Sequence, residues 1–466
     1  MSTTKKQAVV LVHGIGEQRP METVREFVKS VWVKDTNLEN TRFWNKPSEV
    51  SGSFEHRRLT TDYATIKNNP DKGTTSRVDF FEYYWAHHTV GTTLEHLRGW
   101  VFSVLSRKPS DYPSALKPMI YLLWALIITI GVILITINFF EPADAEQGGT
   151  SLHKIYENYI SPVLLFILGI AVAKIVSYLG DVARYITATP SNIKVRKEIR
   201  DGGVKLLESI AKTGKYDRIV LVGHSLGSII AYDVLTQYWA RKNKFKNAAG
   251  ESLPLSGDAL ELIHAMEDID HLPRGEEYRK LQRQLFKQLK LDTEAHSENG
   301  ETSQWLVSDL VTIGSPLTYA DFLLFENKMD FVDRKLDREY PTSPPVKENE
   351  HYYYQTADNK FLHHGAVFSL VRWTNIYSKP FNIFYGDLIS GPVSRAFANP
   401  QISKDLVSEE QPDSPILDID VEAAYPKRYP RLFTHTNYWR WHDNFDREGA
   451  PDHILKLRES LGLVDW

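Results

Sequence analysis

The sequence predicts an α/β protein with a mostly parallel central sheet, helices on both faces of the sheet, and an inserted helical hairpin. Two apolar runs, residues 7–12 and 218–222, are typical of strands buried on both faces. The second run leads directly into residues 228–235, whose apolar pattern has a helical period. Between the two strands lies a long uncharged stretch, residues 119–140. We therefore expect one elaborated domain, split by an insertion.

The pentapeptide Gly223-His224-Ser225-Leu226-Gly227 joins the second strand to the following helix. A sharp turn between a strand and a helix holds its central residue in a strained backbone conformation. Glycine two residues before and two residues after the serine lets this turn close, because a side chain at either position would collide with the neighbouring strand or helix. The pattern predicts a nucleophile elbow that exposes the Ser225 hydroxyl. The alternative is that Ser225 only caps the helix.

The first strand ends in the loop His13-Gly14-Ile15-Gly16. A loop of this kind supplies backbone N–H groups that can bind an oxyanion. We expect the N–H groups of Ile15 and Leu226 to bind the oxygen that becomes negative in a tetrahedral intermediate. His13 is interpreted as a structural residue, because a base is expected to follow the acid in the chain.

These motifs, together with the later Gly314-Ser315-Pro316, resemble those of α/β-hydrolases of the serine lipase and esterase type. The string G-H-S-L-G-S-I-I-x-Y-D and the G-S-P string also resemble intracellular DDHD-type phospholipases. The resemblance implies the α/β-hydrolase fold, carboxylic ester chemistry and a triad in the order Ser, Asp or Glu, His. The motifs cover only a small part of the chain.

Asp387 is the predicted acid of the triad. It follows two apolar runs, residues 373–377 and 381–385, and stands at an expected strand end before turn residues. In related lipases an Asp often lies closer behind the first of these strands, where this chain has residues 378–380. Asp387 could equally form a turn by bonding its own backbone. Its rivals are Asp333, Asp418 and Asp420.

His435 is the predicted base, because it follows Asp387 in a loop-like stretch that leads into an aromatic segment. Its rivals are His442 and His453, whereas His363 and His364 precede Asp387 and would break the expected order. His224 is expected to pack or hydrogen bond beneath the elbow. Ser315 is expected to be a turn residue and no second nucleophile.

Residues 119–140 and 159–180 are predicted to form two transmembrane helices, since each is long enough and apolar enough to cross a bilayer. The alternative is a pair of helices buried in a soluble cap. Basic residues flank the outer ends and acidic residues dominate the connecting loop, which predicts that both ends are cytoplasmic. The apolar run of residues 8–12 is too short for a signal peptide.

The expected organisation is therefore a hydrolase domain in two parts, residues 1–117 and 182–466, separated by a membrane hairpin at 118–181. The charged region 242–299 is a candidate helical cap.

Composition narrows the remaining classes of function. The chain has no Cys, which excludes disulfides and thiol catalysis, and its net charge of −4 gives no reason to expect nucleic acid. No phosphate-binding loop or metal-ligand spacing is evident. The adjacent pairs His87-His88 and His363-His364 are expected to diverge in strands. We therefore expect no cofactor and no metal, and the oligomeric state stays open.

The sequence as a whole predicts a membrane-anchored serine hydrolase that cleaves a carboxylic ester, most simply of a lipid, through an acyl-enzyme. In this hypothesis Ser225 attacks, His435 transfers the proton and Asp387 orients His435. An acyltransferase or thioesterase on the same triad is an alternative. A further alternative is an inactive, membrane-tethered interaction protein.

Overall fold

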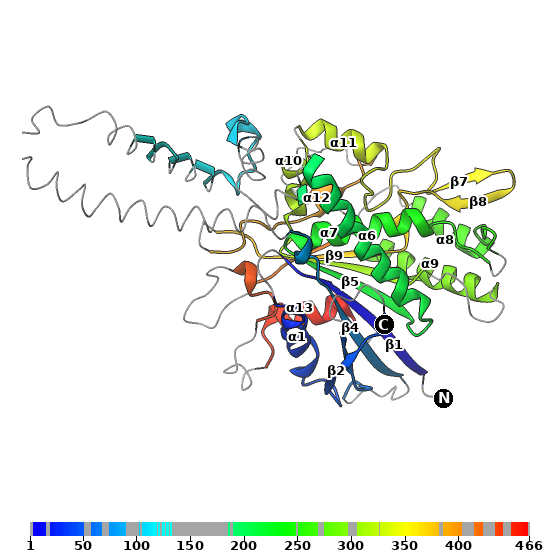
Figure 1. Cartoon of the computed structure of the whole chain (residues 1–466). Coiled ribbons are helices and arrows are strands. Elements are labelled where there is room, and N and C mark those ends of the chain that lie inside the picture. The colour runs from blue at the N-terminus through cyan, green and yellow to red at the C-terminus, as the bar shows by residue number, and fades with distance from the viewer. Residues whose placement is uncertain are drawn as a thin grey trace, which may run out of the picture. The chain divides into compact units, whose positions relative to one another are not determined.

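The computed structural model describes most of the chain outside the expected membrane hairpin (Figure 1). The described residues are 3–14, 19–50, 57–67, 74–89, 102, 105–118, 120–121, 124–125, 127–129, 131–132, 185–186, 190–247, 250–268, 275–296, 305–325, 327–381, 385–402, 414–422, 434–440 and 449–464. The chain forms two compact units: Met1–His88 with Lys194–Trp466, and Thr89–Ile193.

The first unit contains an eight-stranded sheet in the order β10-β9-β6-β5-β1-β4-β3-β2. Neighbouring strands from β10 to β4 are parallel, and the pairs β4–β3 and β3–β2 are antiparallel. The mostly parallel α/β sheet is therefore confirmed. The strands are β1 (Thr3–Val12), β2 (Phe43–Pro47), β3 (Arg57–Thr61), β4 (Thr74–Tyr83), β5 (Arg218–His224), β6 (Val307–Ile313), β9 (Arg372–Tyr377) and β10 (Leu417–Asp420).

Helices cover both faces of this sheet, as predicted. Figure 1 shows α6 (Pro190–Lys212) and α7 (Leu226–Lys242) on one side, and α1 (Glu22–Val28) and α13 (Asp452–Leu461) on the other. Other α-helices among the described residues are α8 (Gly257–Glu267), α9 (Gly275–Ala295), α10 (Ala320–Leu323), α11 (Lys328–Leu336) and α12 (Ser394–Phe397). A separate antiparallel hairpin consists of β7 (Tyr353–Thr356) and β8 (Asn359–Leu362).

Strand β5 is buried along its whole length, which explains its uninterrupted apolar sequence. On one face, Val220 and Val222 belong to a core cluster with Phe27 of α1 and Leu457 of α13. On the other face, α7 packs against β5, β1 and β6. The apolar runs at residues 7–12 and 218–222 are thus buried strands, as the sequence predicts, and the structure shows that they are neighbours in the sheet.

The register aligns the carboxyl ends of the central strands. Val12 pairs with Gly223, His224 pairs with Ile313, and Ile313 pairs with Ile376. The segments that follow β1, β5, β6 and β9 therefore emerge at one edge of the sheet. In open α/β sheets this edge is where sites are built.

Two local expectations were wrong. His87 and His88 lie in the 3₁₀ turn η2 (Ala86–Thr89), which brings their rings to a centroid distance of 3.9 Å instead of letting them diverge. The apolar run after β9 does not continue the sheet in its described residues. Instead, the Phe381 N–H donates to the Tyr385 carbonyl.

The candidate cap region contains α8 and α9. Helix α9 packs against β9, and the Arg279 guanidinium donates to the carbonyl oxygen of Trp373 near the beginning of that strand. Lys290 of the same helix donates to the Asp217 carbonyl, just before β5. These contacts join α9 to the amino ends of the strands, away from the carboxyl edge.

The expected membrane spans fall largely or wholly beyond the described residues: all of 159–180 and much of 119–140. Within the described part of the chain, no helix has the length and apolar character needed to cross a membrane.

Candidate active site

Ser225 occupies the sharp turn between β5 and α7. Its φ of 54° and ψ of −129° are strained for a residue with a side chain. A Cβ atom at Gly223 would lie 2.5 Å from the Ser228 Cα atom, and one at Gly227 would lie 2.3 Å from the Val12 carbonyl oxygen. Both contacts are too short, so the turn requires glycine at the two predicted positions. The Ser225 side chain makes no capping hydrogen bond to α7, which removes the alternative of a simple helix cap.

The structure brings Ser225, His435 and Asp387 together. His435 Nε2 lies 2.8 Å from Ser225 Oγ, and His435 Nδ1 lies 2.9 Å from Asp387 Oδ2. The two ring nitrogens of one imidazole therefore bridge a hydroxyl and a carboxylate. Ser225 and Asp387 are buried, whereas the His435 side chain is 24% exposed. Three segments far apart in the sequence thus form one hydrogen-bonded chain.

Asp387 reaches this position through a loop that folds back on β9. The Asp387 N–H donates to the carbonyl of Ser378, the residue directly after the strand, at 3.2 Å. Gly386 has a φ of 90°, and a Cβ atom there would lie 2.5 Å from the Lys379 carbonyl oxygen. Glycine thus allows both the positive φ and the close approach. Asp387 therefore lies beside the carboxyl end of β9, although it is ten residues beyond the strand in the sequence.

The Asp387 carboxylate has further donors besides His435. The Tyr438 hydroxyl donates to Oδ2 at 2.7 Å, and the Ile389 N–H donates to Oδ1 at 3.1 Å. Burial alone would raise the pKa of Asp387. The attraction of His435 and the hydrogen bonds from His435, Tyr438 and Ser390 outweigh burial and lower this pKa to about 2. Asp387 is therefore ionised at neutral pH.

His435 responds to its surroundings in the opposite direction. Burial favours the neutral imidazole, but the charge of Asp387 and its hydrogen bond have the larger combined effect and raise the pKa of His435 above its usual 6.5. The carboxylate thus makes the imidazole more basic and also fixes the orientation of its ring. Both effects favour proton transfer from Ser225.

His224, directly before the nucleophile, contacts the segment that carries His435. Its Nε2 donates to the His435 carbonyl oxygen at 2.9 Å, and its ring meets Trp439 edge-on at a centroid distance of 4.7 Å. Burial lowers the pKa of His224 to about 3, so it stays neutral. The expectation that His224 packs and hydrogen bonds beneath the elbow is confirmed.

The predicted oxyanion donors are only partly described. Leu226 is the first residue of α7, where backbone N–H groups have no acceptor within the helix and the helix dipole favours negative charge. Ile15 lies outside the described residues. Its neighbour Gly14 approaches the nucleophile so closely that a Cβ atom there would lie 2.9 Å from the Ser225 Cβ atom. The loop after β1 therefore begins beside Ser225.

His13 is a buried structural residue, as expected. Its Nδ1 donates to the Gly14 carbonyl at 2.8 Å, and its ring stacks on Trp85. Burial lowers the pKa of His13 to about 4.

Two of the three rival acids have other hydrogen-bond partners. Asp418 accepts hydrogen bonds from the N–H groups of Val393 and Ser394, and Asp420 accepts one from the Lys379 N–H. Asp333 lies on α11.

Among the other candidate histidines, two have contacts elsewhere and one is not described. His453 lies on α13, where its ring contacts the Arg440 carbonyl at 3.4 Å. His363 follows β8, and its Nδ1 accepts from the Gly365 N–H at 3.1 Å. His442 lies outside the described residues.

Two functional contacts escaped the sequence analysis. Ser228 donates to the Ser225 carbonyl at 2.6 Å, and its hydroxyl also bonds that of Ser315 at 2.7 Å, which ties the G-S-P segment to the elbow. Tyr438 binds Asp387, as described above. The only signal for Tyr438 in the sequence is its position three residues after His435.

The arrangement as a whole can activate a hydroxyl. A serine with an imidazole in hydrogen-bonding distance, itself oriented by a carboxylate, has the geometry of an activated nucleophile. Comparison of the chain with protein-family models, with curated proteins and with solved structures gave no match.

Proposed function

We propose that the chain is a serine hydrolase of the α/β-hydrolase fold that cleaves carboxylic esters, with lipids as the substrate class. The observation that carries this proposal is the pair of hydrogen bonds made by His435, at 2.8 Å to Ser225 and 2.9 Å to Asp387. The strained conformation of Ser225 and the order of the three residues along the chain support it.

In the proposed reaction, Ser225 Oγ attacks the ester carbonyl carbon while His435 Nε2 takes the hydroxyl proton. The N–H groups of Leu226 and Ile15 stabilise the resulting oxyanion. The intermediate collapses, the alcohol leaves with the proton from His435, and the acyl group stays on Ser225. Water then attacks the acyl-enzyme with His435 as base, and the carboxylic acid is released.

A lipid substrate is favoured by the proposed membrane hairpin at residues 119–140 and 159–180. A site held at the bilayer surface meets acyl chains at a high local concentration. Large apolar side chains of the described residues in the first of these segments are exposed, as expected of residues that contact lipid: Tyr121, Trp124, Ile127, Ile128 and Val132. We further propose that the catalytic unit and both termini are cytoplasmic.

The hydrolase proposal is tested by labelling the detergent-solubilised full chain with a fluorophosphonate and locating the modified residue by mass spectrometry. We expect labelling at Ser225 that is lost in Ser225→Ala and in His435→Ala. Ser460→Ala, on α13, is the matched serine control and should label like the parent protein. Hydrolysis of a short-chain ester should follow the same pattern.

Absence of labelling in folded protein would contradict the hydrolase proposal. Labelling that survives His435→Ala would contradict the role of His435 and direct attention to His442 or His453.

Membrane anchoring is tested separately by washing membranes with alkaline carbonate. Retention in the pellet is expected from two spanning helices. Release into the supernatant would contradict anchoring and leave the hydrolase proposal unaffected.

A further inference from the structure

Two histidines and a glutamate come together at the carboxyl end of α8. His264, Glu267 and His351 each offer one ligand atom, and these three atoms lie within 4.8 Å of one another. His264 and Glu267 are three residues apart on α8, so they share one face of the helix. His351 comes from the segment just before β7. The cluster is independent of Ser225 and was missed in the sequence because its two parts are more than 80 residues apart.

Glu267 is the fixed point of this cluster. Its side chain is buried, and its Oε1 accepts the Tyr352 N–H at 2.6 Å. This hydrogen bond leaves Oε2 facing His351 Nδ1 at 3.0 Å. A backbone donor that orients a carboxylate in this way is typical of the outer shell around metal ligands.

The two histidine rings are also oriented. His264 Nε2 lies 3.1 Å from the Tyr353 hydroxyl, and the His351 ring stacks on Tyr353 at a centroid distance of 4.5 Å. Tyr353 therefore contacts both imidazoles. Packing of this kind reduces the conformational freedom that the side chains would lose on binding a ligand.

The separation of the Glu267 and His351 ligand atoms is close to that between neighbouring ligands of a tetrahedral metal site. Bonds of about 2.0–2.1 Å at tetrahedral angles place neighbouring ligand atoms about 3.3 Å apart. The separation of 3.0 Å between Glu267 Oε2 and His351 Nδ1 nearly matches this value. His264, which lies within 4.8 Å, has to approach by no more than about 1.5 Å. Rotation of a partly exposed side chain can supply that movement.

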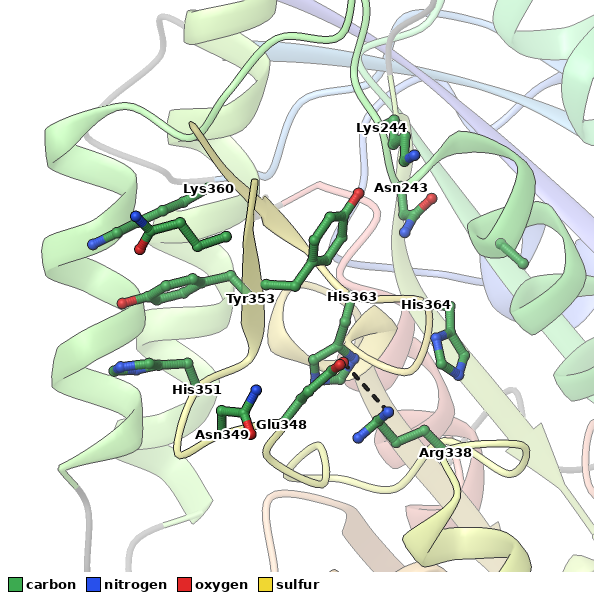
Figure 2. A pocket seen from close by; sticks show the side chains of 13 residues that line it. Asn243, Lys244, Arg338, Glu348, Asn349, His351, Tyr353, Lys360, His363 and His364 are labelled. Atoms are coloured by element: carbon green, nitrogen blue, oxygen red, sulfur yellow. Dashed lines mark ion pairs between the residues drawn. The ribbon is translucent and has the colours of Figure 1, made fainter. Parts of the chain in front are cut away.

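We propose that His264, Glu267 and His351 bind one zinc-class divalent transition metal ion. Two imidazoles and one carboxylate are a donor set that suits such an ion, and three protein ligands leave one position for water. His351 and Tyr353 line a cavity of about 900 Å³, shown in Figure 2, from which that water is supplied. The bound ion joins α8 to the segment that leads into the β7–β8 hairpin.

The cavity also contains a histidine that can serve as a control, His364. Figure 2 shows His364 on the opposite side of the cavity from His351, with the ion pair between Arg338 and Glu348, at 3.3 Å, lying between them. His364 is therefore a histidine of the same cavity that lies outside the proposed ligand set.

The experiment is equilibrium dialysis of the detergent-solubilised full chain against Zn²⁺, with bound metal measured by mass spectrometry. We expect one ion per chain. His264→Ala and His351→Ala should each weaken binding at least about tenfold, since each removes a ligand. His364→Ala should bind like the parent protein.

Glu267→Gln keeps an oxygen that can accept the Tyr352 N–H but loses the charge, so it tests metal binding with the least risk to folding. It should also weaken binding at least about tenfold. With Co²⁺ in place of Zn²⁺, the parent protein should show the intense visible absorption of a four-coordinate ion, and the three ligand variants should lose it.

Three results would overturn the proposal: no binding by the parent protein, equal binding by the ligand variants and His364→Ala, or a Co²⁺ spectrum of a six-coordinate aqueous ion. Thermal unfolding of each metal-free variant identifies any that fails to fold. If an alanine variant does not fold, the Glu267→Gln variant decides whether the cluster binds metal.

Discussion

His224 Nε2 donates a hydrogen bond to the backbone carbonyl of His435 at 2.9 Å, so the residue beside the proposed nucleophile holds the segment that carries the proposed base. This hydrogen bond joins two residues that are 211 positions apart in the sequence, and it holds His435 close to Ser225. Because His224 is neutral throughout the physiological range, this contact does not change with pH. The elbow therefore supplies both the nucleophile and a support for its base.

Replacing His224 by Phe should slow ester hydrolysis without abolishing it. Phe preserves a ring against Trp439 but leaves the His435 carbonyl without its donor, a loss of about 1–3 kcal/mol. We expect kcat to fall more than KM changes, since the effect is on the position of the base. His224→Gln retains an N–H donor and should recover part of the rate. Equal rates for the Phe and Gln variants would show that the hydrogen bond does not position His435.

The activity should increase with pH through a midpoint above 6.5. His435 must be neutral to accept the serine proton, and Asp387 raises its pKa above that value. Asp387→Asn removes the attraction, so the midpoint should move to lower pH while the plateau rate falls by about 10⁴-fold. The measurement is the pH profile of kcat/KM between pH 5 and 9. A midpoint that stays unchanged in Asp387→Asn would contradict the pairing.

Tyr438→Phe should move the same midpoint in the other direction. Without the 2.7 Å hydrogen bond the Asp387 carboxylate becomes more basic and attracts protonated His435 more strongly. The free energy of unfolding should also fall by about 1.5–3 kcal/mol, as for hydrogen bonds to charged groups. The matched control is Tyr319→Phe. In the parent protein the Tyr319 hydroxyl donates to the Leu388 carbonyl at 3.2 Å. A shift of the midpoint in both variants would refute a specific role for Tyr438.

Gly227→Ala should destabilise the protein by about 1–3 kcal/mol or more, because the new Cβ atom would lie only 2.3 Å from the Val12 carbonyl oxygen and neither α7 nor β1 can move freely. Gly257→Ala is the control. Nothing lies within 4 Å of a Cβ atom there, at the beginning of α8, so its stability should be unchanged or raised by up to about 1 kcal/mol. Thermal unfolding of both variants checks this. Similar stabilities would argue against the close packing of the elbow.

Local sequence patterns were sufficient for the features that depend on neighbouring residues. The strand before Ser225, its two glycines and the helix after it all follow from local sterics and hydrophobic period, and the structure has them as expected. The parallel pairing of β1 with β5 likewise agrees with two apolar runs buried on both faces. The sequence also indicated His435 and Asp387 through their order along the chain, although local patterns left their rivals open.

Only the tertiary structure decided how distant segments meet. Asp387 lies ten residues beyond β9, and a returning loop closed by Ser378 brings it to the strand end. The bonds from His224 to His435 and from Tyr438 to Asp387, and the grouping of His264, Glu267 and His351, join segments whose separation no local pattern spans. The physical reason is that periodicity and turn preferences act over a few residues, whereas these contacts depend on packing of the whole sheet and its loops.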